Sequence, residues 1–148
     1  MIAKKILWLA VLTMIGVAPA LVADAQCAAT TMKGAYGFSG SGLDTVHKSG
    51  SPSSGPGLAP VFFFGTVTFA KDGTLYGRFT ANGNGHKENA EPFKGAYVVN
   101  ANCTGSLAVI ENDGHESHFS MTISHSGKEI LAMQTDPGAE RPFLIKRQ

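Results

Sequence analysis

PVFFFGTVTFAKDGTLYGRFTANG, residues 60–83, is the stretch that decides the fold. It contains two runs rich in β-branched and aromatic residues, separated by Lys71-Asp72-Gly73. Asp-Gly between two such runs is a strong hairpin signal, because glycine readily adopts the positive φ that a tight turn requires. The stretch therefore predicts two antiparallel strands, at residues 61–70 and 74–81.

The rest of the chain repeats this alternation of strand and turn. Residues 43–59 form a loop rich in Ser, Gly and Pro, residues 82–90 are predicted to form a polar turn, and no helical period follows residue 25. Strands joined by short turns pair as antiparallel neighbours. We therefore expect an all-β fold, an up-and-down meander of about eight strands closed into a small barrel, with a β-sandwich as the alternative. The further strands are expected at residues 33–42, 91–100, 103–111, 115–124, 128–135 and 141–147.

The first 25 residues have the layout of an export signal. Lys4 and Lys5 precede an apolar run that is too short for a spanning helix, and Ala23-Asp24-Ala25 offers an A-x-A cleavage site. Cleavage there would leave Gln26 as the new N-terminus; an uncleaved anchor or buried helix is the alternative. We expect residues 1–25 to be a cleaved signal peptide and residues 26–148 to form a single β-barrel domain, periplasmic or secreted, with no stable membrane anchor.

The charge balance excludes one class of partner. The 12 basic and 11 acidic residues of the chain become ten of each once Lys4, Lys5 and Asp24 are removed. Nucleic-acid binding depends on an excess of positive charge that neutralises phosphates. No nucleic-acid partner is therefore expected, and the sequence leaves the oligomeric state open.

Cys27 and Cys103 are the two cysteines of the chain. An exported chain with two cysteines most simply forms one disulfide, although two free thiols remain the alternative. The bond would fix the N-terminal end of the domain against the start of a central strand. The enclosed loop is long enough for a stabilisation of roughly 4 kcal/mol in the chain-entropy model.

One face of the predicted barrel is strongly apolar, with many aromatic side chains. If that face encloses a cavity, its rings and thioethers would line it, as in most apolar pockets; a filled core is the alternative. The leading hypothesis is a barrel that binds a small apolar molecule, with loop 43–59 as a gate. The expected ligand-binding residues are Val61, Phe63, Val67, Phe69, Phe79, Tyr97, Phe119 and Met121.

No catalytic, metal or cofactor motif stands out. His115 and His118 are three residues apart on a predicted strand, so their rings point to opposite faces; Glu88 and Glu91 flank a polar turn. We therefore name no catalytic residue, no metal site and no cofactor. An isomerase or cyclase that uses the same cavity is an alternative function, and it would need an inward polar residue: Tyr36, Tyr97 or Glu111.

Several segments resemble small exported bacterial proteins with a calycin-like barrel, similar in fold to lipocalins and to the allene oxide cyclase barrel. The segments are Gly-Ala-Tyr-Gly-Phe at 34–38, Phe-Gly-Thr-Val-Thr-Phe-Ala-Lys-Asp-Gly-Thr-Leu at 64–75, Gly-Ala-Tyr-Val-Val-Asn-Ala-Asn-Cys-Thr-Gly at 95–105 and the terminal strand. The resemblance favours a bacterial source and the periplasm. Lipocalins pack a Gly-x-Trp of the first strand under a basic residue of the last, and the nearest matches here are Gly34-x-Tyr36 with Arg141 or Arg147.

Overall fold

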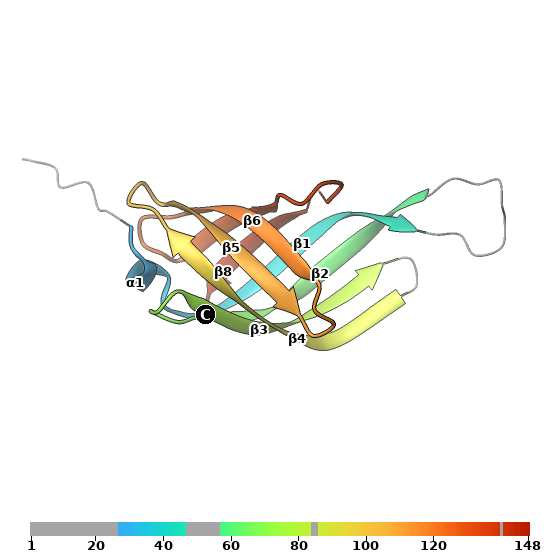
Figure 1. Cartoon of the computed structure of the whole chain (residues 1–148), viewed down its shortest axis with the longest axis horizontal. Coiled ribbons are helices and arrows are strands. Elements are labelled where there is room, and N and C mark those ends of the chain that lie inside the picture. Colours follow the sequence, from blue (N-terminus) through green and yellow to red (C-terminus); the bar gives the residue numbers. More distant parts are fainter. Residues whose placement is uncertain (1–26, 47–56, 84–85, 140) are drawn as a thin grey trace, which may run out of the picture.

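The protein is a closed eight-stranded antiparallel barrel (Figure 1). The computed structural model describes residues 27–46, 57–83, 86–139 and 141–148; the expected signal peptide and the centre of loop 43–59 lie outside these ranges. Each strand pairs with the next, and the last pairs with the first. The meander closed into a barrel is confirmed. The strands are β1 (Gly34–Val46), β2 (Gly57–Phe69), β3 (Thr74–Gly83), β4 (His86–Val99), β5 (Thr104–Glu111), β6 (Glu116–Ile123), β7 (Glu129–Gln134) and β8 (Pro142–Arg147).

The hairpin of β2 and β3 shows how the sequence pattern selects the inner face. Val61, Val67 and Phe69 are buried, whereas Phe62 and Phe64 on the other face of β2 are 58% and 57% exposed. This follows from the two-residue period of a strand. Of the three consecutive phenylalanines, only the middle one therefore faces the interior.

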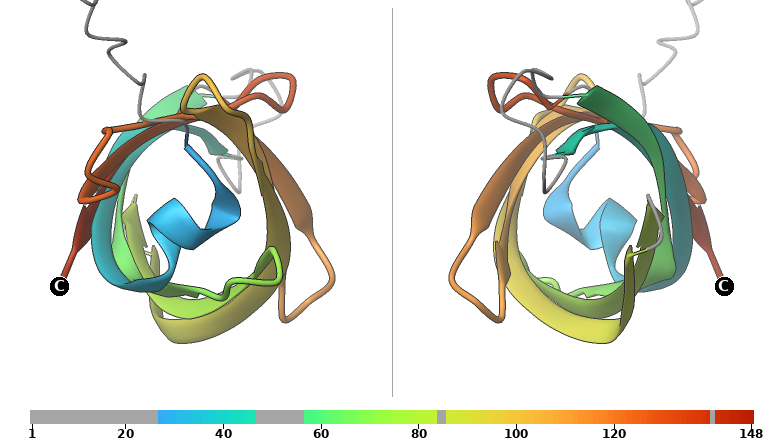
Figure 2. Two further views of the ribbon diagram at one scale, coloured as in Figure 1. Left: turned by 90° about the vertical axis from the view of Figure 1, so that its left-hand side faces the viewer. Right: turned by 90° about the vertical axis from the view of Figure 1, so that its right-hand side faces the viewer.

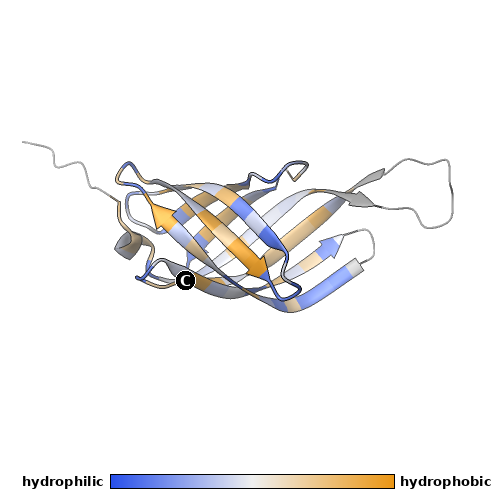
Figure 3. Ribbon diagram, viewed as in Figure 1, coloured by the Kyte–Doolittle hydropathy of each residue, from blue (hydrophilic) through white to orange (hydrophobic). Residues whose placement is uncertain are grey.

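Three local expectations are wrong. Both ends of the loop expected at 43–59 are strand, because β1 runs to Val46 and β2 begins at Gly57. The chain does contain a helix, the single turn α1 (Ala29–Met32), which is too short to show a sequence period. The expected polar turn at 82–90 is almost entirely strand, since β3 runs to Gly83 and β4 begins at His86. Its polar composition reflects the solvent around the strand ends rather than a turn, and Figure 3 shows this hydrophilic end of β4.

α1 lies across one end of the barrel (Figure 2). Met32 is completely buried beneath it, and the Tyr97 hydroxyl oxygen lies 3.1 Å from the Ala29 carbonyl oxygen. The disulfide between Cys27 and Cys103 ties the start of this segment to the turn before β5, so the expected disulfide is confirmed. We call this the closed end of the barrel.

Tyr36 and Arg147 join α1 to the barrel wall. The Tyr36 hydroxyl donates to the Gly127 carbonyl at 2.6 Å and accepts from Arg147 Nη2 at 2.7 Å. Arg147 Nη2 also donates to the Thr31 carbonyl at 2.7 Å, and its guanidinium lies 5.2 Å from the centre of the Tyr36 ring. Of the two basic residues suggested by the lipocalin resemblance, Arg147 is therefore the one that packs on Tyr36.

No described segment lies across the other end of the barrel, which we call the open end. It is bordered by the far ends of β1 to β4, by the turn between β5 and β6 and by the segment between β7 and β8. Within the described ranges no helix is long and apolar enough to cross a membrane.

Candidate ligand cavity

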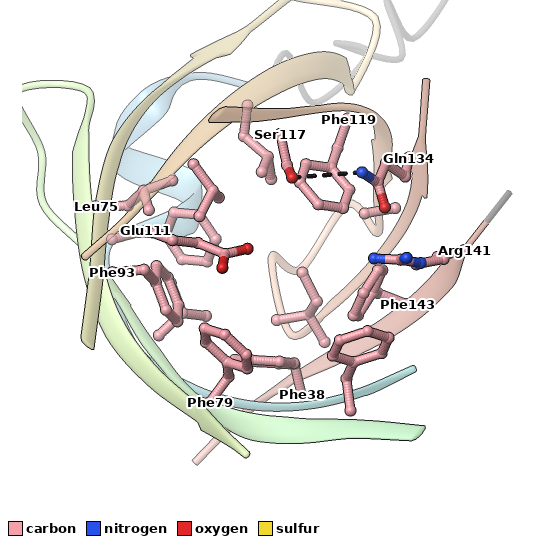
Figure 4. Close-up of a pocket in the computed structure, with 17 residues that line it drawn as sticks. Phe38, Leu75, Phe79, Phe93, Glu111, Ser117, Phe119, Gln134, Arg141 and Phe143 are labelled. Carbon is pink, nitrogen blue, oxygen red and sulfur yellow. Dashed lines mark hydrogen bonds between the residues drawn. The ribbon is translucent and has the colours of Figure 1, made fainter. Parts of the chain in front are cut away.

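The half of the barrel toward the open end encloses a chamber of about 90 Å³ (Figure 4). One water needs roughly 10–15 Å³, and an engineered apolar cavity of roughly 150 Å³ in another protein holds a benzene ring. The chamber is therefore too large to be a packing defect and suits a compact apolar group. Its lining includes seven phenylalanines together with aliphatic side chains: Phe38, Phe63, Val67, Phe69, Leu75, Phe79, Phe93, Leu107, Val109, Phe119, Ala132, Phe143 and Ile145.

Inward-facing glycines explain why so many rings leave a space between them. Gly65 pairs with Phe38, Gly77 with Phe93 and Gly40 with Phe143 across neighbouring strands. In each pair the ring of the phenylalanine occupies the place of the missing Cβ. The ring thus lies over the backbone of the next strand and follows the wall, which leaves the centre of the chamber open (Figure 4).

The rings also contact one another around the wall. Phe38 packs edge-on against Phe93 and Phe143 at 6.1 Å between ring centres, and Phe119 packs edge-on against Phe143 at 5.5 Å. Edge-to-face contacts of this kind stabilise aromatic clusters beyond their buried area. The aromatic lining is therefore a connected layer with little freedom to collapse into the chamber.

Ser117 and Gln134 introduce polar atoms into this apolar wall. Both are buried, and Gln134 Nε2 donates to Ser117 Oγ at 3.3 Å and to Asp136 Oδ2 at 3.0 Å. A carboxylate oxygen only accepts hydrogen bonds, so the amide nitrogen must face Asp136. The amide oxygen of Gln134 consequently points away from these partners, to the side of Arg141 (Figure 4).

Glu111 and Arg141 face each other across the chamber from opposite walls (Figure 4). Burial raises the pKa of the Glu111 carboxyl, and the charges of Asp113 and Glu88 raise it further, whereas His115 and Arg141 oppose the shift. The guanidinium of Arg141 lies 5.1 Å from the centre of the Phe63 ring. The chamber therefore combines an apolar wall with one acidic and one basic side chain.

Beyond the chamber the barrel widens into a mouth of about 570 Å³. Phe63, Phe79, Glu111, Gln134 and Arg141 border both spaces, so the chamber opens into the mouth. The mouth is more polar than the chamber, and its described lining carries four carboxylates. These belong to Glu88, Glu111, Asp113 and Asp136.

The eight residues expected to bind a ligand occupy three places. Val61 lines the mouth, and Tyr97 and Met121 are buried outside the lining of the chamber. Tyr97 belongs to the closed end, where its hydroxyl donates to the Ala70 carbonyl at 2.6 Å. Strand parity placed these side chains inward but carried no information on their height along the barrel axis. The five that line the chamber are Phe63, Val67, Phe69, Phe79 and Phe119.

Of the three polar residues considered for catalysis, only Glu111 reaches the chamber; Tyr36 and Tyr97 are engaged at the closed end. Sequence reasoning missed Ser117, Gln134 and Arg141 as lining residues. Ser117 has the same strand parity as Phe119, and Gln134 has the same parity as Ala132. The alternation of the two strands could therefore have identified both polar residues as inward-facing. Arg141 likewise shares the inward parity of Phe143 and Ile145 in the strand expected at 141–147, so the same alternation applied to it.

Within the described ranges no group of three His, Cys, Asp or Glu side chains is arranged to hold a metal ion. His118 Nδ1 instead lies 2.9 Å from Asp136 Oδ1 on the outside of the barrel.

Comparison with known proteins shows the fold but no family. No protein-family model matches the chain, and a search of the curated proteins finds no match. A redesigned β-barrel is similar with a TM-score of 0.53 and 14% identity, covering 82% of this chain and 95% of its own. A de novo designed fluorescence-activating β-barrel is similar with a TM-score of 0.50 and 15% identity, covering 81% and 96%. At these identities the likeness concerns the barrel architecture alone.

Proposed function

We propose that this protein binds a small apolar molecule in the chamber of its barrel. The observation that carries the proposal is the open chamber of about 90 Å³ behind a connected layer of phenylalanines. A structural protein with a filled core would have no void larger than about one water. A preformed apolar cavity with a few polar groups is the usual form of a small-molecule site.

The proposal also includes a family relationship and a cellular compartment. The contact of Tyr36 with Arg147 resembles the closing pair of lipocalins and supports a calycin-like relationship. The Cys27–Cys103 disulfide is compatible with export to an oxidising compartment such as the periplasm or the medium.

One of the similar solved structures is a designed barrel that activates fluorescence, which supports the suitability of this architecture for small ligands.

The test is ligand-induced stabilisation of the disulfide-bonded protein. A ligand that binds only the folded state at 100 times its Kd raises the free energy of unfolding by about 2.7 kcal/mol. We expect compact apolar compounds to raise the melting temperature, and native mass spectrometry to detect the bound species. An unchanged melting temperature across a diverse apolar library would contradict the proposal.

A matched pair of variants locates the site. Ala132 is buried and lines the chamber, so Ala132→Leu would fill it and abolish the ligand-induced shift. Ala96 is exposed on the outer face of β4, and Ala96→Leu adds the same atoms there. The control should retain the full shift, and loss of the shift in both variants would place the ligand elsewhere.

The buried carboxyl group of Glu111 supports one alternative function, that of an isomerase or cyclase acting in the same chamber. A carboxyl group with a raised pKa in an apolar site is typical of a general acid or base. Turnover of a bound ligand by the wild-type protein, and its loss in Glu111→Gln with binding retained, would support this alternative.

A further inference from the structure

The polar groups that border the chamber offer both donors and acceptors, and the Glu111 carboxylate is the strongest acceptor among them. None of the described residues donates a hydrogen bond to the Glu111 carboxylate, whose pKa responds to burial and to neighbouring charges alone. The amide nitrogen of Gln134 is engaged by Asp136 and Ser117, and its oxygen lies on the side of Arg141, across the chamber from Glu111 (Figure 4). A ligand with an N–H donor would satisfy the Glu111 carboxylate, whereas a ligand with acceptors alone would leave it without a partner.

The charges at the mouth also favour a cationic ligand. The described lining of the mouth carries the carboxylates of Glu88, Glu111, Asp113 and Asp136 but a single guanidinium, that of Arg141. A concave site lined mainly by one sign of charge raises the local concentration of ligands of the opposite sign. The mouth therefore favours the entry of cations.

Aromatic rings surround the position that a cation on Glu111 would occupy. Phe93 lies directly opposite Glu111 across β4 and β5, and the ring of Phe79 packs 6.2 Å from that of Phe93. Phenyl faces attract cations, and the attraction grows when water is excluded. The same rings bury the apolar part of a ligand.

We infer that the chamber takes a protonated primary amine carried on a compact apolar body, with its ammonium group against Glu111 and its carbon chain among the phenylalanines. This inference rests on the proposed binding function and specifies its ligand class. The size of the chamber, below that of a benzene-binding cavity, favours a short branched alkyl chain over a ring.

Three probes with one carbon skeleton separate the contribution of the head group from that of the apolar body. They are 2-methylpropylamine, 2-methylpropan-1-ol and 2-methylpropanoate, titrated at pH 7 and low salt with amide chemical shifts as the readout. A charge-assisted hydrogen bond is worth about a tenfold change in affinity or more. We expect the amine to bind about tenfold tighter than the alcohol, the carboxylate to bind most weakly, and added salt to weaken the amine alone.

Glu111→Gln should reduce the affinity for the amine about tenfold and leave that for the alcohol unchanged. Glu129→Gln removes the same charge from the outer wall, where Glu129 pairs with Lys146 at 2.9 Å, and should change neither affinity. If Glu111→Gln does not fold, the order of the three probe affinities on the wild-type protein and the salt dependence of that order still test the inference.

The outcomes that contradict the inference are distinct from those that contradict the proposed function. Equal binding of amine and alcohol would overturn the inference and leave an apolar binding barrel. Tightest binding of the carboxylate would overturn it in favour of Arg141 as the head-group partner. Binding of none of the three would overturn both.

Discussion

Gly77 on β3 and Phe93 on β4 lie directly opposite each other, and the Phe93 ring occupies the space that a side chain at position 77 would need. The carbonyl oxygen of Thr66 closes the same space from β2. The glycine thus allows three strands and an aromatic ring to approach within one layer of the wall. This contact keeps the Phe93 ring away from the centre of the chamber.

Gly77→Ala should therefore destabilise the barrel. The new methyl group would overlap the Thr66 carbonyl, which is backbone and cannot rotate away, and would push the Phe93 ring inward. Overpacking of this kind costs about 1–3 kcal/mol. Denaturant unfolding of the variant and the wild type measures the difference.

Gly37→Ala is the matched control for this substitution. A Cβ at Gly37 on β1 would meet nothing nearer than Gln148 Nε2 at 3.4 Å. Its effect on the free energy of unfolding should stay within about 0.5 kcal/mol. Equal losses in the two variants would show that glycine flexibility, and not the contact with Phe93, sets the stability.

The parts of the fold that sequence reasoning captured are those with a local physical cause. The alternation in β2 identified Val67 and Phe69 as inward, because a strand has a period of two. The Asp-Gly turn and the cysteine pair were likewise readable from short-range chemistry. The four-residue helix α1 was missed because one turn shows no period.

The parts that escaped depend on position along the barrel axis. Strand parity cannot distinguish Phe79, in the chamber, from Tyr97, at the closed end, because both point inward. Arg141 shares the inward parity of Phe143, but parity does not show that its guanidinium reaches the chamber. The start of β4 resembled a turn because strand ends that project into solvent accept polar residues on both faces.

Loss of the Cys27–Cys103 disulfide should destabilise the barrel and free its closed end. The cysteines are 76 residues apart, which corresponds to roughly 4 kcal/mol in the chain-entropy model. Urea unfolding with and without reductant should show this loss, and the Cys27→Ser/Cys103→Ser double variant should match the reduced protein. Amide hydrogen exchange should increase most in α1, which includes Met32. Unchanged protection there would contradict the conclusion that the disulfide holds the closed end in place.

Tyr36→Phe should also loosen the closed end. The hydroxyl of Tyr36 donates to the Gly127 carbonyl and accepts from Arg147, so its removal leaves both groups short of a partner inside a buried contact. A loss of about 1–3 kcal/mol is expected in the free energy of unfolding. Tyr76→Phe removes the same atom from a ring that is 58% exposed and should have almost no effect. Similar values for the two variants would contradict the prediction.

The contact between His118 and Asp136 should make stability depend on pH. The hydrogen bond that the protonated His118 ring donates to the Asp136 carboxylate raises the pKa of His118 above its usual 6.5. The backbone N–H of His118, followed by the side chains of Gln134 and His118, lowers the pKa of Asp136 from 3.8 to about 2. The contribution of His118 to the free energy of unfolding is complete below pH 6.5 and is lost as the pH rises through the pKa of His118 in the folded state. The contribution of Asp136 is complete above pH 3.8 and is lost as the pH falls toward 2.

The segment between β7 and β8 should therefore be held most firmly between pH 3.8 and pH 6.5. His118→Asn should reduce stability within that window and converge with the wild type at alkaline pH, because the wild-type histidine is then neutral. His115→Asn, at an exposed histidine in the turn between β5 and β6, should leave the wild-type profile largely intact. Thermal unfolding at several pH values gives the comparison, and parallel profiles for the wild type and His118→Asn would show that the contact does not contribute through its charge.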